Sequence, residues 1–156
     1  MEKKSIKALK IVSTLTLIFI IAGIVLYGIQ TYFVFAENSI KLDSHHGGIK
    51  LAWFIADRLL ILITAGLLIA FAKNILKSIK SGEIFNRCNV KILFALVVVL
   101  PIYTFVGDNL STICLAEDEC SLIITDNPFI YTAVTLLVAL LYKLAYDTAE
   151  EQKLTV

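Results

Sequence analysis

Two adjacent charged residues, Asp57 and Arg58, interrupt an apolar stretch that covers residues 51–72. The uncharged part of this stretch, residues 59–72, is too short to cross a bilayer, because a spanning helix needs about 20 predominantly apolar residues. A spanning helix here must therefore include both charged residues. Charges inside a bilayer are costly and often mark a binding site or an ion pathway. Together with Asp108, at the end of a later apolar stretch, they are predicted to form an intramembrane polar site.

Helix geometry predicts a partner for Arg58. Consecutive residues on a helix point about 100° apart, so Asp57 and Arg58 are not expected to pair well with each other. Asp108 is instead predicted to pair with Arg58 and to line an outward-facing polar cavity with it. The alternative is that Arg58 extends along its aliphatic stem to the membrane surface, because Lys50 lies only about 12 Å away along a helix.

The cysteines suggest a covalent link. Cys114 and Cys120 lie in one acidic loop with five residues between them, and an oxidising compartment favours a disulfide that closes this loop. A zinc site that joins them to His45 and His46 has suitable ligand types, but the spacing matches no standard zinc motif. The sequence also contains no HExxH, no Gly-rich phosphate loop and no Ser/His/Asp set. We predict no metal, no cofactor and no catalytic residues.

The composition places these residues in a membrane protein. The chain has 58% hydrophobic and 17% charged residues, whereas soluble domains typically have about 45–50% and about 25%. The apolar residues form four runs near the length that crosses a bilayer: 11–36, 51–72, 90–106 and 128–146. Although Val34 and Ala36 fit a signal-peptide cleavage site, the first run exceeds the roughly 7–15 residues of a signal peptide. We predict an all-α fold, a single-domain antiparallel four-helix membrane bundle over residues 1–156.

Lysine and arginine predict the orientation of the bundle, because they concentrate on the cytoplasmic side of membrane proteins. Basic residues gather in the N-terminal segment and in the connection between the second and third runs: Lys3, Lys4, Lys7, Lys10, Lys73, Lys77, Lys80, Arg87 and Lys91. The other two loops contain only Lys41 and Lys50. Both termini are therefore predicted to be cytoplasmic, and the loops with His45 and Cys120 to face outward.

Local signals predict further details. Asn86 or Asn89 is expected to cap the third helix, since a short side-chain acceptor satisfies free backbone N–H groups there. Lys143 and Asp147 are four residues apart and are expected to pair on one helix. Tyr27 is expected to lie with other aromatic residues at a membrane interface.

Two short patterns carry a family resemblance. Residues 81–86 are Ser-Gly-Glu-Ile-Phe-Asn with Asn89 three positions on, and residues 150–156 are Glu-Glu-Gln-Lys-Leu-Thr-Val. The chain thereby resembles DUF2975, a family of small bacterial four-helix membrane proteins of unknown function. That family shows Gly-x-x-Phe-Ser/Thr-x-x-Asn after its second helix and a Glu-rich, Leu-Thr-Val/Ile ending. Asn86 departs from the usual Ser or Thr, and Lys153 from a common acidic residue.

The resemblance implies a bacterial inner-membrane protein, and some relatives are encoded beside small helix-turn-helix regulators. Both patterns fall on the predicted cytoplasmic face, where the C-terminal tail is expected to pack against the 82–89 turn. The predicted surface for a cytoplasmic protein partner, such as a helix-turn-helix regulator, comprises Gly82, Phe85, Asn86, Asn89, Leu154, Thr155 and Val156.

The leading functional hypothesis is a non-enzymatic interaction or regulatory module in the lipid bilayer, without direct nucleic-acid binding. The alternative is a subunit of a small transporter or channel that uses Asp57, Arg58 and Asp108 as a polar pathway. Because four spans are few for a monomeric transporter, this alternative requires a homo-oligomer.

The predicted orientation is tested by a reporter fused after Val156. Because the basic segments hold both termini in the cytoplasm, a reporter active only in the cytoplasm is expected to work there, and one active only after export is expected to be silent. An exported reporter would overturn the orientation.

Overall fold

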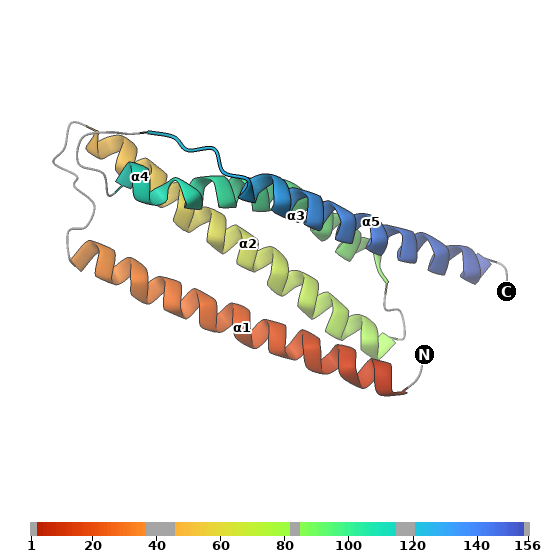
Figure 1. The fold of residues 1–156 in the computed structure, drawn as a ribbon. Helices are drawn as coiled ribbons and strands as arrows, with labels where there is room; N and C mark the ends of the chain where they lie inside the picture. The colour runs from red at the N-terminus through yellow and green to blue at the C-terminus, as the bar shows by residue number, and fades with distance from the viewer. Residues whose placement is uncertain (1–2, 37–45, 82–84, 115–120, 155–156) are drawn as a thin grey trace.

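A computed structural model describes residues 3–36, 46–81, 85–114 and 121–154, and these residues form five α-helices. The helices are α1 (Lys3–Ala36), α2 (Gly47–Ser81), α3 (Arg87–Asp108), α4 (Leu110–Cys114) and α5 (Asn127–Leu154), shown in Figure 1. The described residues contain no strand. The prediction of an all-α fold is confirmed.

Four of the helices are long and apolar enough to cross a membrane, as in a multi-pass membrane protein. Each extends beyond the apolar run that predicted it, because helix-favouring charged and polar residues continue the helix past the run. In α2, Lys50 and Lys73 are separated by about 34 Å at 1.5 Å per residue, close to the roughly 30 Å of a hydrocarbon core. Asp57 and Arg58 lie between these lysines.

The long helices pack in series. α1 packs against α2, α2 against α3, and α3 against α5, while α4 packs against α2 and α3. Consecutive long helices run in opposite directions (Figure 1). Among the described residues, α1 makes no close helix-to-helix packing with α3 or α5. The bundle is therefore an open row, in which α1 packs closely on one long helix of the described chain, α2.

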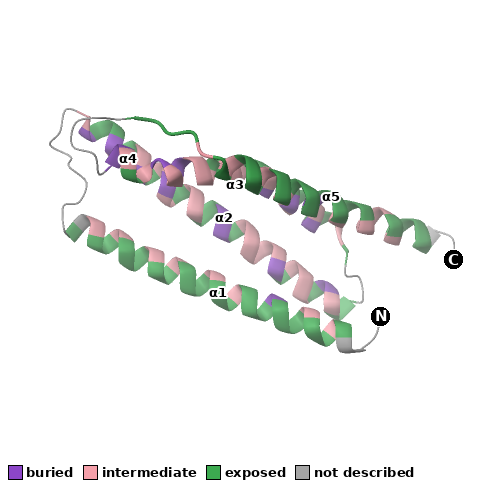
Figure 2. Ribbon diagram, viewed as in Figure 1, coloured by how far each residue is buried: buried purple, intermediate pink, exposed green. Residues whose placement is uncertain are grey.

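Many residues along α1 and α5 are exposed, as Figure 2 shows, and many of these residues are large and hydrophobic. Large side chains such as Phe19, Leu26 and Leu144 are 74%, 67% and 63% exposed. Contiguous apolar surface of this extent is unusual on a soluble protein, whereas hydrocarbon solvates it. A small core lies between α3 and α5, built on Leu93, Leu96 and Ala139.

A hydrogen-bonded cluster joins α2, α3 and α5 at the end of the bundle that bears the exposed Lys73, Lys77, Lys80, Arg87 and Lys91, which we call the basic end. Asn86 caps α3 by accepting from the backbone N–H of Asn89 at 2.8 Å, so this predicted cap is confirmed. The Asn86 amide also donates to the hydroxyl of Ser78 at 2.8 Å. Asn89 has a different role, because its amide donates to the hydroxyl of Tyr142 at 3.0 Å.

The opposite end, which we call the α4 end, contains structure that the sequence did not predict. α4 lies in a segment predicted to be a loop, since its five residues are too few to show a helical apolar period. Asn109, which is fully buried, accepts from the backbone N–H of Ile123 at 2.6 Å and donates to its carbonyl at 2.9 Å. These bonds fix the segment that leads into α5.

α5 reaches beyond the start of α3. It begins beside Asp108, where the Asn127 amide donates to the carboxylate at 3.1 Å, and Tyr142 meets Asn89 near the first turn of α3. Residues 143–154 continue for about 18 Å at 1.5 Å per residue. The predicted pair on this extension is confirmed, with Lys143 Nζ 2.9 Å from Asp147 Oδ2.

The Asn86 cap gives a stability prediction. Asn86→Ala removes both the cap acceptor and the donor to Ser78, and loss of a cap costs about 1 kcal/mol (range about 0.5–2). Asn86→Asp retains the acceptor and is expected to lose less. Free energies of unfolding in detergent micelles measure both, and equal values for Asn86→Ala and the natural chain would contradict the prediction.

Candidate intramembrane binding site

Asp57 is buried where α1, α2 and α3 approach one another. It is 1% exposed, and its Oδ2 accepts a hydrogen bond from the hydroxyl of Tyr27 on α1. On the other side lies Gly107 of α3, where an added Cβ would stand 3.7 Å from Oδ1, an ordinary contact. The carboxylate therefore occupies the space between two helices that do not pack against each other.

Arg58 turns into the bundle rather than toward the membrane surface. Its side chain is 14% exposed, and its guanidinium carbon lies 4.0 Å from the ring centroid of Tyr27 and 4.4 Å from that of Phe54. The cation is thus enclosed by two aromatic rings, an arrangement that is attractive and strengthens when water is excluded. The alternative of a side chain extending to the outer surface is wrong.

The predicted partners of Arg58 need correction. Its Nη1 lies 3.5 Å from Oδ2 of Asp57, its sequence neighbour, because the long side chain bends back and is held between the two rings. Asp108 does not pair with Arg58. It accepts instead from the hydroxyl of Thr125 and from the amide of Asn127, since the segment before α5 folds back over the end of α3.

Asp57 and Asp108 nevertheless share a cavity. Its volume is about 310 Å³, and it is lined by side chains from α1, α2 and α3 together with Leu110: Tyr27, Gln30, Asp57, Tyr103, Thr104, Gly107 and Asp108. This volume lies at the lower end of ligand pockets, which are about 300–1,000 Å³. Two residues of the predicted site, Asp57 and Asp108, therefore line one cavity, whereas Arg58 lies beside Asp57 and is not part of this lining.

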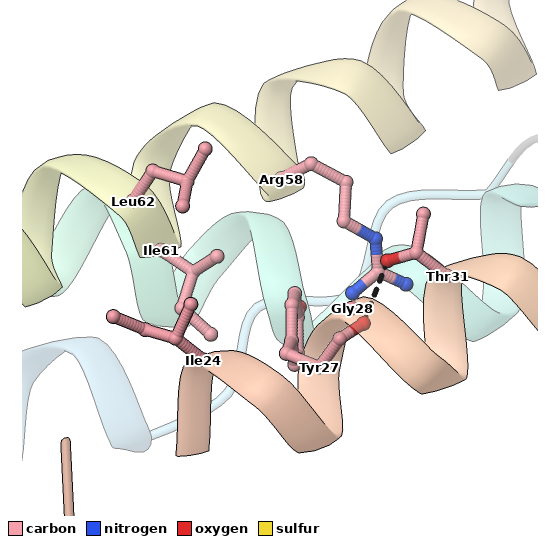
Figure 3. A pocket seen from close by; sticks show the side chains of 7 residues that line it. All are labelled: Ile24, Tyr27, Gly28, Thr31, Arg58, Ile61 and Leu62. Atoms are coloured by element: carbon pink, nitrogen blue, oxygen red, sulfur yellow. Dashed lines mark hydrogen bonds between the residues drawn. The ribbon is translucent and has the colours of Figure 1, made fainter. Parts of the chain in front are cut away.

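Two further cavities touch Arg58. One of about 280 Å³ lies between α1 and α2, and Figure 3 shows Arg58 reaching from α2 toward Tyr27 and Thr31 of α1 at this cavity. The other, of about 260 Å³, lies toward the α4 end and includes Gln30, Phe54 and Ser111 in its lining. The ionised pair is consequently bordered by space on several sides.

Arg58 has hydrogen-bonding capacity that the chain does not use. Its Nε and Nη1 are buried, and neither has a hydrogen-bond partner. A buried donor without an acceptor costs about 1–3 kcal/mol, and more when the group is charged. Such groups are rare in native structures, so these two atoms call for a physical explanation.

The sequence analysis missed the residues that hold the charged pair. Tyr27 was predicted at a membrane interface, yet it contacts both Asp57 and Arg58. Gln30 and Tyr103, which line the shared cavity, were not singled out. One signal was available, since Tyr27, Gln30 and Thr31 are spaced by three and four positions and so share one face of an otherwise apolar helix.

The predicted partner surface at the basic end is only partly accessible. Asn89 is fully buried and therefore cannot contact a partner, because it is committed to the contact with Tyr142. The ring of Phe85 packs edge-on against Tyr142 at a centroid distance of 5.4 Å, but it is still 37% exposed. Gly82, Thr155, Val156 and the side chain of Leu154 lie outside the described residues.

The cysteine predictions stay open. Cys114 is buried, and its Sγ lies 3.3 Å from the backbone carbonyl oxygen of Lys50. Cys120 and His45 lie outside the described residues, so the disulfide remains a prediction. Within the described ranges, no three His, Cys, Asp or Glu residues gather in a way that could hold a metal ion.

Comparison of the chain with protein-family models, with curated proteins and with solved structures found no match. Membership of DUF2975 is therefore still a prediction, and the function has to be argued from the geometry.

Tyr27 gives a prediction for the site. Tyr27→Phe keeps the ring beside Arg58 but removes the hydroxyl that donates to the buried carboxylate, and a hydrogen bond to a charged group contributes about 1.5–3 kcal/mol. The free energy of unfolding in micelles is expected to fall by that amount. Tyr32→Phe, on the same helix but 70% exposed, is the matched control. Equal losses in the two variants would contradict the assignment.

Proposed function

We propose that this chain is a non-enzymatic regulatory protein of the bacterial inner membrane, which binds a small ligand beside Asp57 and Arg58 and presents its basic end to a cytoplasmic partner. Both termini lie in the cytoplasm in this proposal, because the lysine-rich segments gather at one end of the bundle. The ligand site then lies in the outer half of the membrane, about 12 Å along α2 from Lys50.

The observation that carries the proposal is the buried charged pair with cavities on several sides. Replacement of a buried ion pair by apolar residues is often neutral or stabilising, so such a pair is weak support for a purely structural role. Charged residues within membrane helices commonly serve binding or transport. Two guanidinium nitrogens without acceptors favour binding in particular.

The proposal of a cytoplasmic partner at the basic end has weaker support than the proposal of a ligand beside Asp57 and Arg58. Phe85 is partly exposed there, and the side chains of Arg87, Cys88 and Lys91 around it are exposed. Aromatic and arginine side chains are enriched at protein interfaces. The positive charges around Phe85 are complementary to an acidic partner surface. The predicted packing of residues 154–156 on the turn belongs to the same proposal.

The transporter alternative is supported by the cavity that Asp57 and Asp108 share. The row of helices weighs against it for a single chain, because α1 and α5 do not close around a common axis. A transport pathway would need a second copy to complete its wall, and the apolar outer faces of α1 and α5 are equally well explained by lipid.

The proposed function is tested by native mass spectrometry of the full chain purified from membranes. The double variant Asp57→Asn with Arg58→Gln keeps the net charge and removes the ion pair, which folded proteins often tolerate. A small molecule bound to the natural chain is expected to be absent from this variant. The control variant Lys143→Gln with Asp147→Asn removes an exposed pair of 2.9 Å and is expected to retain it.

If neither the natural chain nor the double variant at residues 57 and 58 carries a bound small molecule, ligand binding at this site is overturned.

A further inference from the structure

We propose that the cavity between α1 and α2 binds the carboxylate head of a single-chain fatty acid, which reaches Arg58 from the surrounding lipid. This inference rests on the proposed function and names the ligand class for that same site. It starts from Arg58 Nε and Nη1, both buried and without an acceptor, at a side chain that lines the cavity.

The unpartnered donors of Arg58 favour a head group with acceptor oxygens. A guanidinium has five N–H donors and no acceptor, so an unused Arg58 nitrogen calls for an acceptor. Asp57 does not fill this role, because its Oδ2 lies 3.5 Å from Nη1, beyond the roughly 2.7–3.2 Å of a hydrogen bond. A ligand carboxylate can accept such bonds, and guanidinium and carboxylate match in geometry. Because both nitrogens are covered in the ligand-free chain, the guanidinium has to turn toward the cavity when the ligand binds. A cationic head would instead be repelled by Arg58.

The walls of the cavity favour an apolar tail. Besides Arg58, Tyr27 and Thr31, the lining consists of Ile24, Gly28, Ile61 and Leu62. Figure 3 shows Ile24, Ile61 and Leu62 together on one side of the guanidinium and Thr31 on the other. Thr31 adds no free donor toward the cavity, because its hydroxyl donates to the backbone carbonyl of Tyr27 at 2.8 Å. An acyl chain matches these walls.

The cavity is open on the lipid side. Gly28 and Leu62 are both exposed, and at Gly28 an added Cβ would meet no heavy atom within 4 Å. A volume of about 280 Å³ is small beside the range of ligand pockets. It therefore holds the head and the first part of one chain, and the rest of that chain lies in the hydrocarbon.

The negative charge of Asp57 favours a carboxylic acid over a phospholipid as the head group of the ligand. Its carboxylate already stands near Arg58, so a second anion enters against a like charge. A carboxylic acid can take up a proton when burial and a neighbouring anion disfavour its charged form. A phosphodiester cannot do so near neutral pH. The site therefore favours a carboxylic acid, which can be protonated beside Asp57, over a phosphodiester, which stays charged. Removal of the Asp57 charge is expected to strengthen binding.

The experiment measures equilibrium binding of radiolabelled palmitate to the full chain in dodecyl maltoside. Arg58→Gln is expected to weaken binding at least about tenfold, since the charged donors are lost. Asp57→Asn is expected to bind several-fold more tightly, because the like charge that opposes the ligand carboxylate is removed. Gly28→Leu, which fills the cavity and leaves every polar group in place, is expected to weaken binding about tenfold.

Gly23→Leu is the matched control. Gly23 is an exposed glycine on the same helix, with no heavy atom within 4 Å of an added Cβ, and it does not line the cavity. Its binding is expected to equal that of the natural chain. Helical circular dichroism and a single peak on gel filtration establish that each variant is folded, and Gly28→Leu keeps the test decisive if Arg58→Gln fails to fold.

Competition identifies the head group. Unlabelled palmitate is expected to displace the probe, whereas hexadecyltrimethylammonium and dioleoylphosphatidylglycerol are not. Displacement by either of these at lower concentration than palmitate overturns the inference, and so does unchanged binding in Arg58→Gln or loss of binding in Asp57→Asn. If native mass spectrometry finds another molecule that depends on residues 57 and 58 while palmitate does not bind, the proposed function stands and this inference fails.

Discussion

A buried contact of charged and aromatic side chains joins α1 to α2. A guanidinium about 12 Å along α2 from Lys50 has little water to solvate it, so neighbouring groups have to do so. Tyr27 supplies a hydroxyl to Asp57 and a ring face to Arg58 from the same side chain. Because most of α1 is exposed and, among the described residues, packs closely on α2 alone, this contact adds a polar link to the apolar packing of α1.

The other long helices are joined by different chemistry. At the basic end the amides of Asn86 and Asn89 link the end of α2, the start of α3 and Tyr142 of α5. At the α4 end Asn109 and Asp108 hold the chain that returns to α5. Together with the small apolar core, these contacts link α2, α3 and α5 through residues that all lie outside α1.

The sequence predicted the elements well and their contacts poorly. The four apolar runs identified the long helices because hydrocarbon selects length and composition, and Asn86 and the Lys143–Asp147 pair are local features. Arg58 was assigned the wrong partner because the choice depends on Tyr27 and Phe54, which approach only in the folded chain. Asp108 was likewise misassigned, since its donors come from a segment that folds back. No local pattern in the sequence specifies either approach.

The row order of the helices has a mechanical consequence. Since, among the described residues, α1 packs closely on α2 alone of the long helices, separating α1 from α2 would break the contacts of Tyr27 with Asp57 and Arg58. The small core between α3 and α5 includes no residue of α1. A molecule that entered between α1 and α2 would therefore act on the position of α1 without meeting that core.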